Sequence, residues 1–181
     1  MASKNVLQAG FARADVTPPM GIGIAGYYKE RKADGVLDSL EVVALALRHG
    51  DNTVILMTID HCGIVKEILN PYKEAISAKT GVPTDAIFIH STHTHTGPIL
   101  LPETDDVLIN EYRVFLGRKC VDVAMFAIED LKPAKMGYAV GQAPNIAFVR
   151  RFRMKDGSTK TNPGVNNPDI VAPIGDVDER V

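Results

Sequence analysis

The chain has 181 residues, which is enough for one ordinary domain with a hydrophobic core. Hydrophobic residues make up 45% of it, charged residues make up 23%, and the formal net charge is −2 with histidine neutral, so composition excludes a general attraction to nucleic acid or to an anionic membrane. No apolar run approaches the roughly 20 residues of a membrane-spanning helix. The amino terminus has no apolar signal-peptide segment, so we expect a cytoplasmic protein without an integral membrane segment.

The first predicted element is a strand over residues 7–17, which ends at Pro18-Pro19. Residues 20–28, MGIGIAGYY, follow it and fit the pattern GxGxxG of dinucleotide-binding loops. Two prolines stand where the buried strand of that motif would end, and no amphipathic helix follows. We therefore interpret the run as a loop in which glycine permits a close approach of the backbone.

Two apolar runs at residues 41–48 and 53–60 flank the turn sequence His-Gly-Asp-Asn, which predicts a β-hairpin. Residues 65–80 have apolar positions at helical spacing. Pro71 interrupts this pattern, and because proline is favoured in the first turn, we expect the regular helix to begin near it.

A strand is predicted over residues 86–91, and the longest helix over residues 108–131, where apolar residues recur on one face. Further strands are predicted at 135–141 and 146–152. Residues 155–181 are rich in Pro, Gly and Asn without periodicity, and we interpret them as an extended tail.

The order of these elements contains both a hairpin and a strand–helix–strand crossover. It predicts an α/β fold, a layered domain with a mixed β-sheet flanked by helices. No closing element follows the tail, so we expect the chain to be truncated within that domain. Cys62 and Cys120 form no CxxC pattern and lie in apolar surroundings, which favours two reduced core residues.

Three histidines, His90, His93 and His95, lie within six positions at the end of the strand predicted over 86–91. If the strand geometry persists, His93 and His95 point to the same side and can converge on one zinc ion or one substrate oxygen. The alternative is a pair of partly buried polar residues without chemistry. His90 has the opposite parity to His93, which favours a structural, hydrogen-bonded role.

Asp60 ends the preceding apolar strand, and the intervening helix permits the two strands to be parallel neighbours. Asp60 would then lie near the histidine pair, where it could bind a metal, orient an imidazole or, alternatively, cap a helix. A catalytic zinc usually has three protein ligands, and His-x-His supplies at most two. The chain has neither GxSxG nor HExxH, so the site is incomplete for a hydrolase.

Four segments, in the same order, resemble the neutral/alkaline non-lysosomal ceramidases and their bacterial relatives. They are GFARADVTPPMGIGIAGYY, TVILMTIDHCGI, STHTHTGP and the run from VRRFRMKDGS to the carboxyl terminus. The resemblance implies a zinc enzyme of sphingolipid metabolism that hydrolyses the amide bond of N-acylsphingosine or a related amide. It implies a lipid or small-molecule substrate, and it allows for a homo-oligomer and, since members are often secreted, for export.

The resemblance also implies roles for individual residues. The first histidine of the family's H-T-H motif is a zinc ligand and corresponds to His93, and the second stabilises the oxyanion and corresponds to His95. An arginine that lines the site corresponds best to Arg150, with Arg151 as the alternative. Asp60, from its place at the neighbouring strand end, is expected to support these groups.

The family's remaining zinc ligands and its serine nucleophile lie further along a longer chain and correspond to no residue here. We therefore expect residues 1–181 to be the N-terminal part of a ceramidase-like hydrolase domain, with little activity alone. One alternative is another metal-dependent hydrolase with a strand-end His-x-His, such as a barrel, although the predicted hairpin breaks the regular βα repeat that a barrel needs. The other is a binding module that keeps the fold without the chemistry.

Overall fold

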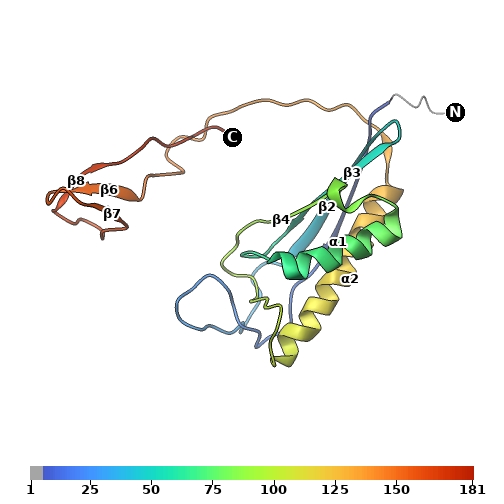
Figure 1. The fold of residues 1–181 in the computed structure, drawn as a ribbon, viewed down its shortest axis with the longest axis horizontal. Coiled ribbons are helices and arrows are strands. Elements are labelled where there is room, and N and C mark those ends of the chain that lie inside the picture. The colour runs from blue at the N-terminus through green and yellow to red at the C-terminus, as the bar shows by residue number, and fades with distance from the viewer. Residues whose placement is uncertain (1–5) are drawn as a thin grey trace. The chain divides into compact units, whose positions relative to one another are not determined.

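The computed structural model describes residues 6–181, which form two compact units, a first that ends at Lys135 and a second over Met136–Val181 (Figure 1). The first unit consists of a five-stranded sheet, two α-helices and one 3-10 turn: β1 (Gln8–Asp15), β2 (Glu41–His49), β3 (Asn52–Ile59), α1 (Lys66–Thr80), η1 (Thr84–Ala86), β4 (Ile87–Ser91), α2 (Val107–Glu129) and β5 (Lys132–Pro133). No helix in the described part of the chain is long and apolar enough to cross a bilayer.

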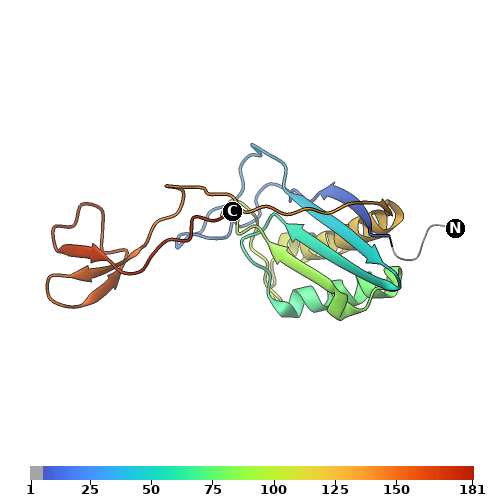
Figure 2. The same ribbon diagram turned by 90° about the horizontal axis from the view of Figure 1, so that it is seen from above.

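The sheet has the strand order β4-β3-β2-β1-β5, in which β3 and β4 are parallel and the other neighbouring pairs are antiparallel. This arrangement confirms the predicted α/β fold with a mixed sheet. Both helices lie on one side of the sheet (Figure 2). The helix α1 connects β3 to β4, as expected for a parallel crossover.

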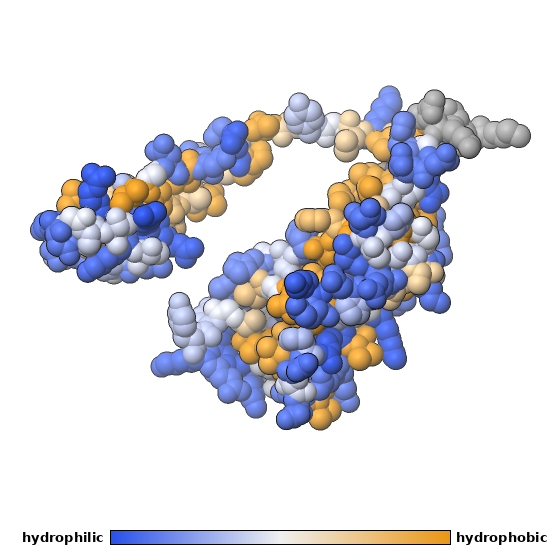
Figure 3. Space-filling view, viewed as in Figure 1, coloured by the Kyte–Doolittle hydropathy of each residue, from blue (hydrophilic) through white to orange (hydrophobic). Residues whose placement is uncertain are grey.

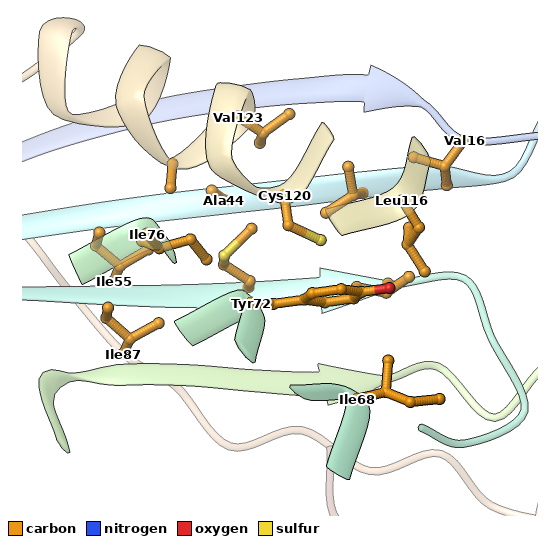
Figure 4. Packing of buried hydrophobic residues seen from close by; sticks show 14 of the residues in the cluster. Val16, Ala44, Ile55, Ile68, Tyr72, Ile76, Ile87, Leu116, Cys120 and Val123 are labelled. Atoms are coloured by element: carbon orange, nitrogen blue, oxygen red, sulfur yellow. The ribbon is translucent and has the colours of Figure 1, made fainter. Parts of the chain in front are cut away.

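The hydrophobic core lies between the sheet and the helices (Figure 4). Alternate residues of β2 point into it, and the small side chains of Ala44 and Ala46 are fully buried there. Gly10 of β1 brings the strand against the end of α2, because a Cβ atom at this position would lie 2.1 Å from the Ala127 carbonyl oxygen. Cys120 is buried in this core, as predicted, and burial raises the pKa of its thiol to about 12.

The start of α1 differs from the sequence prediction, whereas the start of α2 agrees with it. The prediction that α1 begins near Pro71 was wrong, because the helix begins at Lys66 and contains the proline. Ile68 and Tyr72 are buried on either side of Pro71, and this packing holds the first turn although proline lacks the N–H for one helical hydrogen bond. The start of α2 was predicted within one residue, and Asp106 caps it by accepting a hydrogen bond from the Ile109 N–H (3.2 Å).

The second unit contains an antiparallel three-stranded sheet, with β6 (Arg151–Met154) between β7 (Thr159–Thr161) and β8 (Ile170–Pro173). The strand predicted over 135–141 was wrong, since these residues belong to no strand; at their end, Gly141 alone exchanges two backbone hydrogen bonds with Val181, beside the isolated bridge between Gln142 and Arg180. Several apolar side chains between residues 136 and 148 are exposed, namely Met136, Val140, Ile146 and Phe148. Figure 3 shows hydrophobic surface on the second unit. Of the strand predicted over 146–152, only the last two residues belong to β6.

The tail was predicted without regular elements, but it contains β7 and β8. A tight turn at Asp156-Gly157 connects β6 to β7. The Asp156 carboxylate accepts from the Ser158 N–H (2.9 Å), and Gly157 has a φ of 80° that favours glycine. An Asp-Gly pair between two strands is a turn signal in the sequence itself.

Candidate metal centre

The carboxyl ends of β3 and β4 lie side by side, because the two strands are parallel and Ile59 is in register with Ser91. The pairing continues beyond the strands. The Thr92 N–H donates to the Ile59 carbonyl (3.0 Å), and the His93 N–H donates to the His61 carbonyl (2.9 Å). The segments that follow the two strands therefore run together, as was expected from the crossover.

His93 and His95 converge at this edge of the sheet. Their Nε2 atoms are 3.4 Å apart, and their ring centroids are 5.0 Å apart. The two imidazoles were expected to converge because the strand continues through His95, and this explanation was wrong. The strand β4 ends at Ser91, and His93 has a φ of 64°, in the left-handed region. A turn, rather than a continued strand, brings the two imidazoles together.

The backbone of Cys62 orients the His93 ring. The Nδ1 atom of His93 lies 2.5 Å from the Cys62 carbonyl oxygen. A carbonyl oxygen can only accept, so Nδ1 carries the proton and Nε2 has the free lone pair. A histidine held in this way by a carbonyl group is the usual arrangement of a metal ligand.

The glycine-rich run holds the segment that carries His95. It pairs with residues 97–99, where the Ala25 N–H donates to the Gly97 carbonyl (3.0 Å) and the Ile99 N–H donates to the Gly23 carbonyl (2.7 Å). The run is therefore a structural loop, as the sequence analysis predicted.

Close backbone approach occurs at Gly26. A Cβ atom there would lie 2.4 Å from Cγ of His95, so only glycine lets the imidazole lie against the loop. The next residues complete the contact. Arg31 donates from Nη2 to the His95 carbonyl (2.9 Å) and stacks over the Tyr27 ring at 3.5 Å, and Tyr27 presents its ring edge-to-face to His95.

Cys62 lies beside the histidine pair. The prediction that it is a core residue was wrong, since its thiol is partly exposed and 3.8 Å from Nδ1 of His93. One ligand atom from each of Cys62, His93 and His95 lies within 4.8 Å of the others. The position of Cys62, two residues after Asp60, could have indicated that it lies near the histidines. The strand adjacency that brings Asp60 to this edge applies equally to Cys62.

Asp60 is engaged with the neighbouring strand. Its carboxylate accepts from the Glu41 N–H (3.0 Å), and its own N–H donates to the Glu41 carbonyl (2.9 Å). These bonds tie the end of β3 to the start of β2. The support of the imidazoles by Asp60 stays a prediction.

His61 is the buried polar residue of this edge and is 1% exposed. Its Nδ1 atom faces Gly63, whereas its Nε2 atom has no hydrogen-bond partner within residues 6–181. Burial lowers the pKa of His61 to about 4, so the ring is neutral at pH 7. His61 therefore adds no positive charge beside the histidine pair.

The other residues singled out from the sequence are His90, which lies on β4, and Arg150 with its alternative Arg151, which belong to the second unit. His90 is on β4 and its Nε2 atom hydrogen-bonds the Thr58 hydroxyl (2.7 Å), in keeping with a structural role. Arg150 is exposed in the second unit, where its carbonyl accepts from the Asn162 N–H (2.9 Å), and Arg151 begins β6. The place of Arg150 or Arg151 beside the histidines stays a prediction.

The donor set fits zinc. Imidazole nitrogen and thiolate sulfur are the ligands that Zn²⁺ prefers, with Zn–N distances of roughly 2.0–2.1 Å. Two nitrogens at a tetrahedral angle are then roughly 3.3–3.4 Å apart. The Nε2 atoms of His93 and His95 are separated by 3.4 Å, so this pair can adjoin one ion without rearrangement.

No family model matches the chain, and no curated protein matches it. Its fold is similar to the crystal structure of neutral ceramidase from Pseudomonas aeruginosa, with a TM-score of 0.69 and 19% identity, covering 84% of this chain and 25% of that chain. It is also similar to a ceramidase complexed with C2, with a TM-score of 0.68 and the same identity and coverage. The chain thus spans about a quarter of the structures that it matches. The resemblance to neutral ceramidases is confirmed at the level of the fold, which is that of part of a bacterial ceramidase.

Proposed function

We propose that residues 1–181 are the N-terminal part of a zinc-dependent hydrolase of the neutral ceramidase type. The reaction is cleavage of an amide bond, in N-acylsphingosine or a related amide. One observation carries the proposal: the imidazoles of His93 and His95 meet at the carboxyl edge of a ceramidase-like sheet, with Nε2 atoms 3.4 Å apart.

His93 and His95 have different roles in this proposal. When bound, zinc would polarise the scissile carbonyl and lower the pKa of the attacking group. His93 would hold it through Nε2, because Nδ1 is occupied by the Cys62 carbonyl. His95 would donate a hydrogen bond to the carbonyl oxygen as negative charge develops there, from a ring that is fixed against Gly26.

Arg150 and Asp60 have supporting roles in the proposal. The Arg150 guanidinium would add positive charge beside the developing oxyanion, as the family motif suggests. Asp60 would keep the end of β3 in place through its bonds to Glu41, and so keep the following residues beside His93.

Metal binding gives the first test. Zinc content is measured on the purified 181-residue chain and on His93→Ala, with His49→Ala as the matched control, since His49 is an exposed histidine in the β2–β3 hairpin. We expect zinc to bind the chain and the control and to be lost from His93→Ala. A chain without zinc would instead favour the binding module that keeps the fold without the chemistry.

Activity gives the second test, on the product of the complete gene with N-acylsphingosine as substrate. We expect release of sphingosine that requires zinc, is abolished in His93→Ala and falls about 100-fold in His95→Ala. The 181-residue chain alone should show little turnover. Full hydrolysis by His93→Ala would contradict the proposed metal ligand, and turnover by the short chain would contradict the incomplete site.

A further inference from the structure

The two cysteines of the chain are in opposite environments. Cys120 is 0% exposed in the core, whereas Cys62 is partly exposed, and neither forms a disulfide. Cys62 is therefore the thiol that a dissolved cation can reach. It lies outside the H-T-H motif, and the proposed function gives its side chain no role.

Two contacts fix Cys62 beside His93. The Cys62 carbonyl accepts from His93 Nδ1, and the carbonyl of the preceding residue, His61, accepts from the His93 N–H. The backbone at position 62 is thus tied to the residue that would hold the metal. Its sulfur lies 3.8 Å from Nδ1 of His93, and rotation about the Cα–Cβ bond of Cys62 can move it relative to the ring.

The distances are close to those of a coordination shell. With Zn–S near 2.3 Å and Zn–N near 2.0–2.1 Å, a sulfur and a nitrogen on one tetrahedral ion are roughly 3.5 Å apart. The ligand atoms of Cys62, His93 and His95 lie within 4.8 Å of one another, so each separation exceeds that of a tetrahedral site by at most roughly 1–1.5 Å.

We propose that Cys62 binds the same metal ion as His93, through its thiolate. This inference rests on the metal-binding part of the proposed function and adds a second ligand from this chain. A thiolate changes the class of cation that the site accepts. Soft or borderline ions such as Zn²⁺ and Co²⁺ are favoured, and Mg²⁺ and Ca²⁺, which prefer oxygen, are disfavoured.

Cobalt spectroscopy tests this ligand without any measurement of activity. The reduced chain, freed of metal, is titrated with Co²⁺ under anaerobic conditions, and its absorption is recorded. A thiolate bound to Co²⁺ produces a sulfur-to-metal charge-transfer band in the near ultraviolet, which imidazole ligands do not produce. We expect this band in the unchanged chain and in Cys120→Ala, and we expect it to be absent from Cys62→Ser.

Affinity and chemical protection provide independent readouts. Cys62→Ser should weaken Zn²⁺ binding at least about tenfold, or 1.4 kcal/mol. In the unchanged chain, Zn²⁺ should slow the alkylation of Cys62 by iodoacetamide, whereas Mg²⁺ should not. Circular dichroism of each variant confirms that the sheet and helices are retained.

The outcomes separate the two proposals. Cobalt that binds through His93 without a charge-transfer band, together with unchanged affinity in Cys62→Ser, overturns the thiolate ligand and leaves the proposed function intact. Failure of the unchanged chain to bind either Zn²⁺ or Co²⁺ overturns both. A band that persists in Cys62→Ser and disappears in Cys120→Ala would also overturn the inference.

Discussion

The core and the candidate metal centre of the first unit position their side chains by different means. In the core, packing determines where the side chains lie, and Leu116 and Ile76 are fully buried between the sheet and the helices. At the candidate metal centre His93 and His95 are exposed, and backbone contacts determine the orientation of their rings. These contacts are the hydrogen bond to the Cys62 carbonyl and the close approach of Gly26. Stability and metal binding should therefore respond to different substitutions.

Leu116→Ala is expected to have the largest effect on the core side of this comparison. Removal of a fully buried leucine should lower the free energy of unfolding by about 2–5 kcal/mol, because it loses apolar burial and leaves a cavity. Urea unfolding measures the loss, and Zn²⁺ affinity of the folded protein should change less than twofold. A tenfold loss of affinity would show that packing also positions the site.

Gly26→Ala should affect both the stability and the candidate site, because this glycine belongs to the backbone that positions His95. Its φ of 90° strains any other residue by roughly 1–2 kcal/mol, and the added Cβ would force the His95 ring to move. We expect lower stability in urea and, in the proposed full-length hydrolase, slower amide hydrolysis. Gly35→Ala is the matched control, because a Cβ there meets nothing within 4 Å.

Asp106→Ala should reduce stability alone. The loss of the hydrogen bond from the Ile109 N–H removes the cap of α2 and should cost about 1 kcal/mol. Zinc affinity should not change, since the cap belongs to no contact of the histidines. Asp105→Ala changes the charge equally without removing the cap, and an equal loss of stability in that variant would contradict the capping role.

The reactivity of the two thiols provides the mildest test, because it changes no residue and leaves stability unaltered. A disulfide reagent at pH 8 should react quickly with Cys62 alone and with Cys120 only after unfolding, because burial raises the Cys120 pKa to about 12. Raising the pH from 7 to 9 stays well below that pKa, so it should not expose a second reactive thiol. Two fast-reacting thiols in the folded chain would contradict the contrast between the cysteines.

The main sheet and its helices could be predicted because their residues repeat at the periods of strands and helices. Local patterns were insufficient where tertiary contacts decide. The burial of Ile68 outweighs Pro71 at the start of α1. The apolar alternation of residues 135–141 forms no strand, because a backbone partner is present only at its end, where Val181 pairs with Gly141. The short strands β7 and β8 depend on turns and have little periodicity.

The candidate site could be predicted in part. The spacing of His93 and His95 indicated that their rings converge, although the cause is a turn. Cys62 was missed because residues beyond a strand end follow a path that alternation does not describe. Strand adjacency alone, which placed Asp60 at this edge, was the available guide to it.

The left-handed backbone of His93 has a consequence for how this sequence can change. At a φ of 64° glycine is the residue without steric cost, and a histidine there costs roughly 1 kcal/mol. A search for more stable variants would therefore select His93→Gly, and the same change would remove the Nε2 atom that faces His95. If His93 binds a metal as proposed, selection for stability and selection for chemistry act in opposite directions at this position.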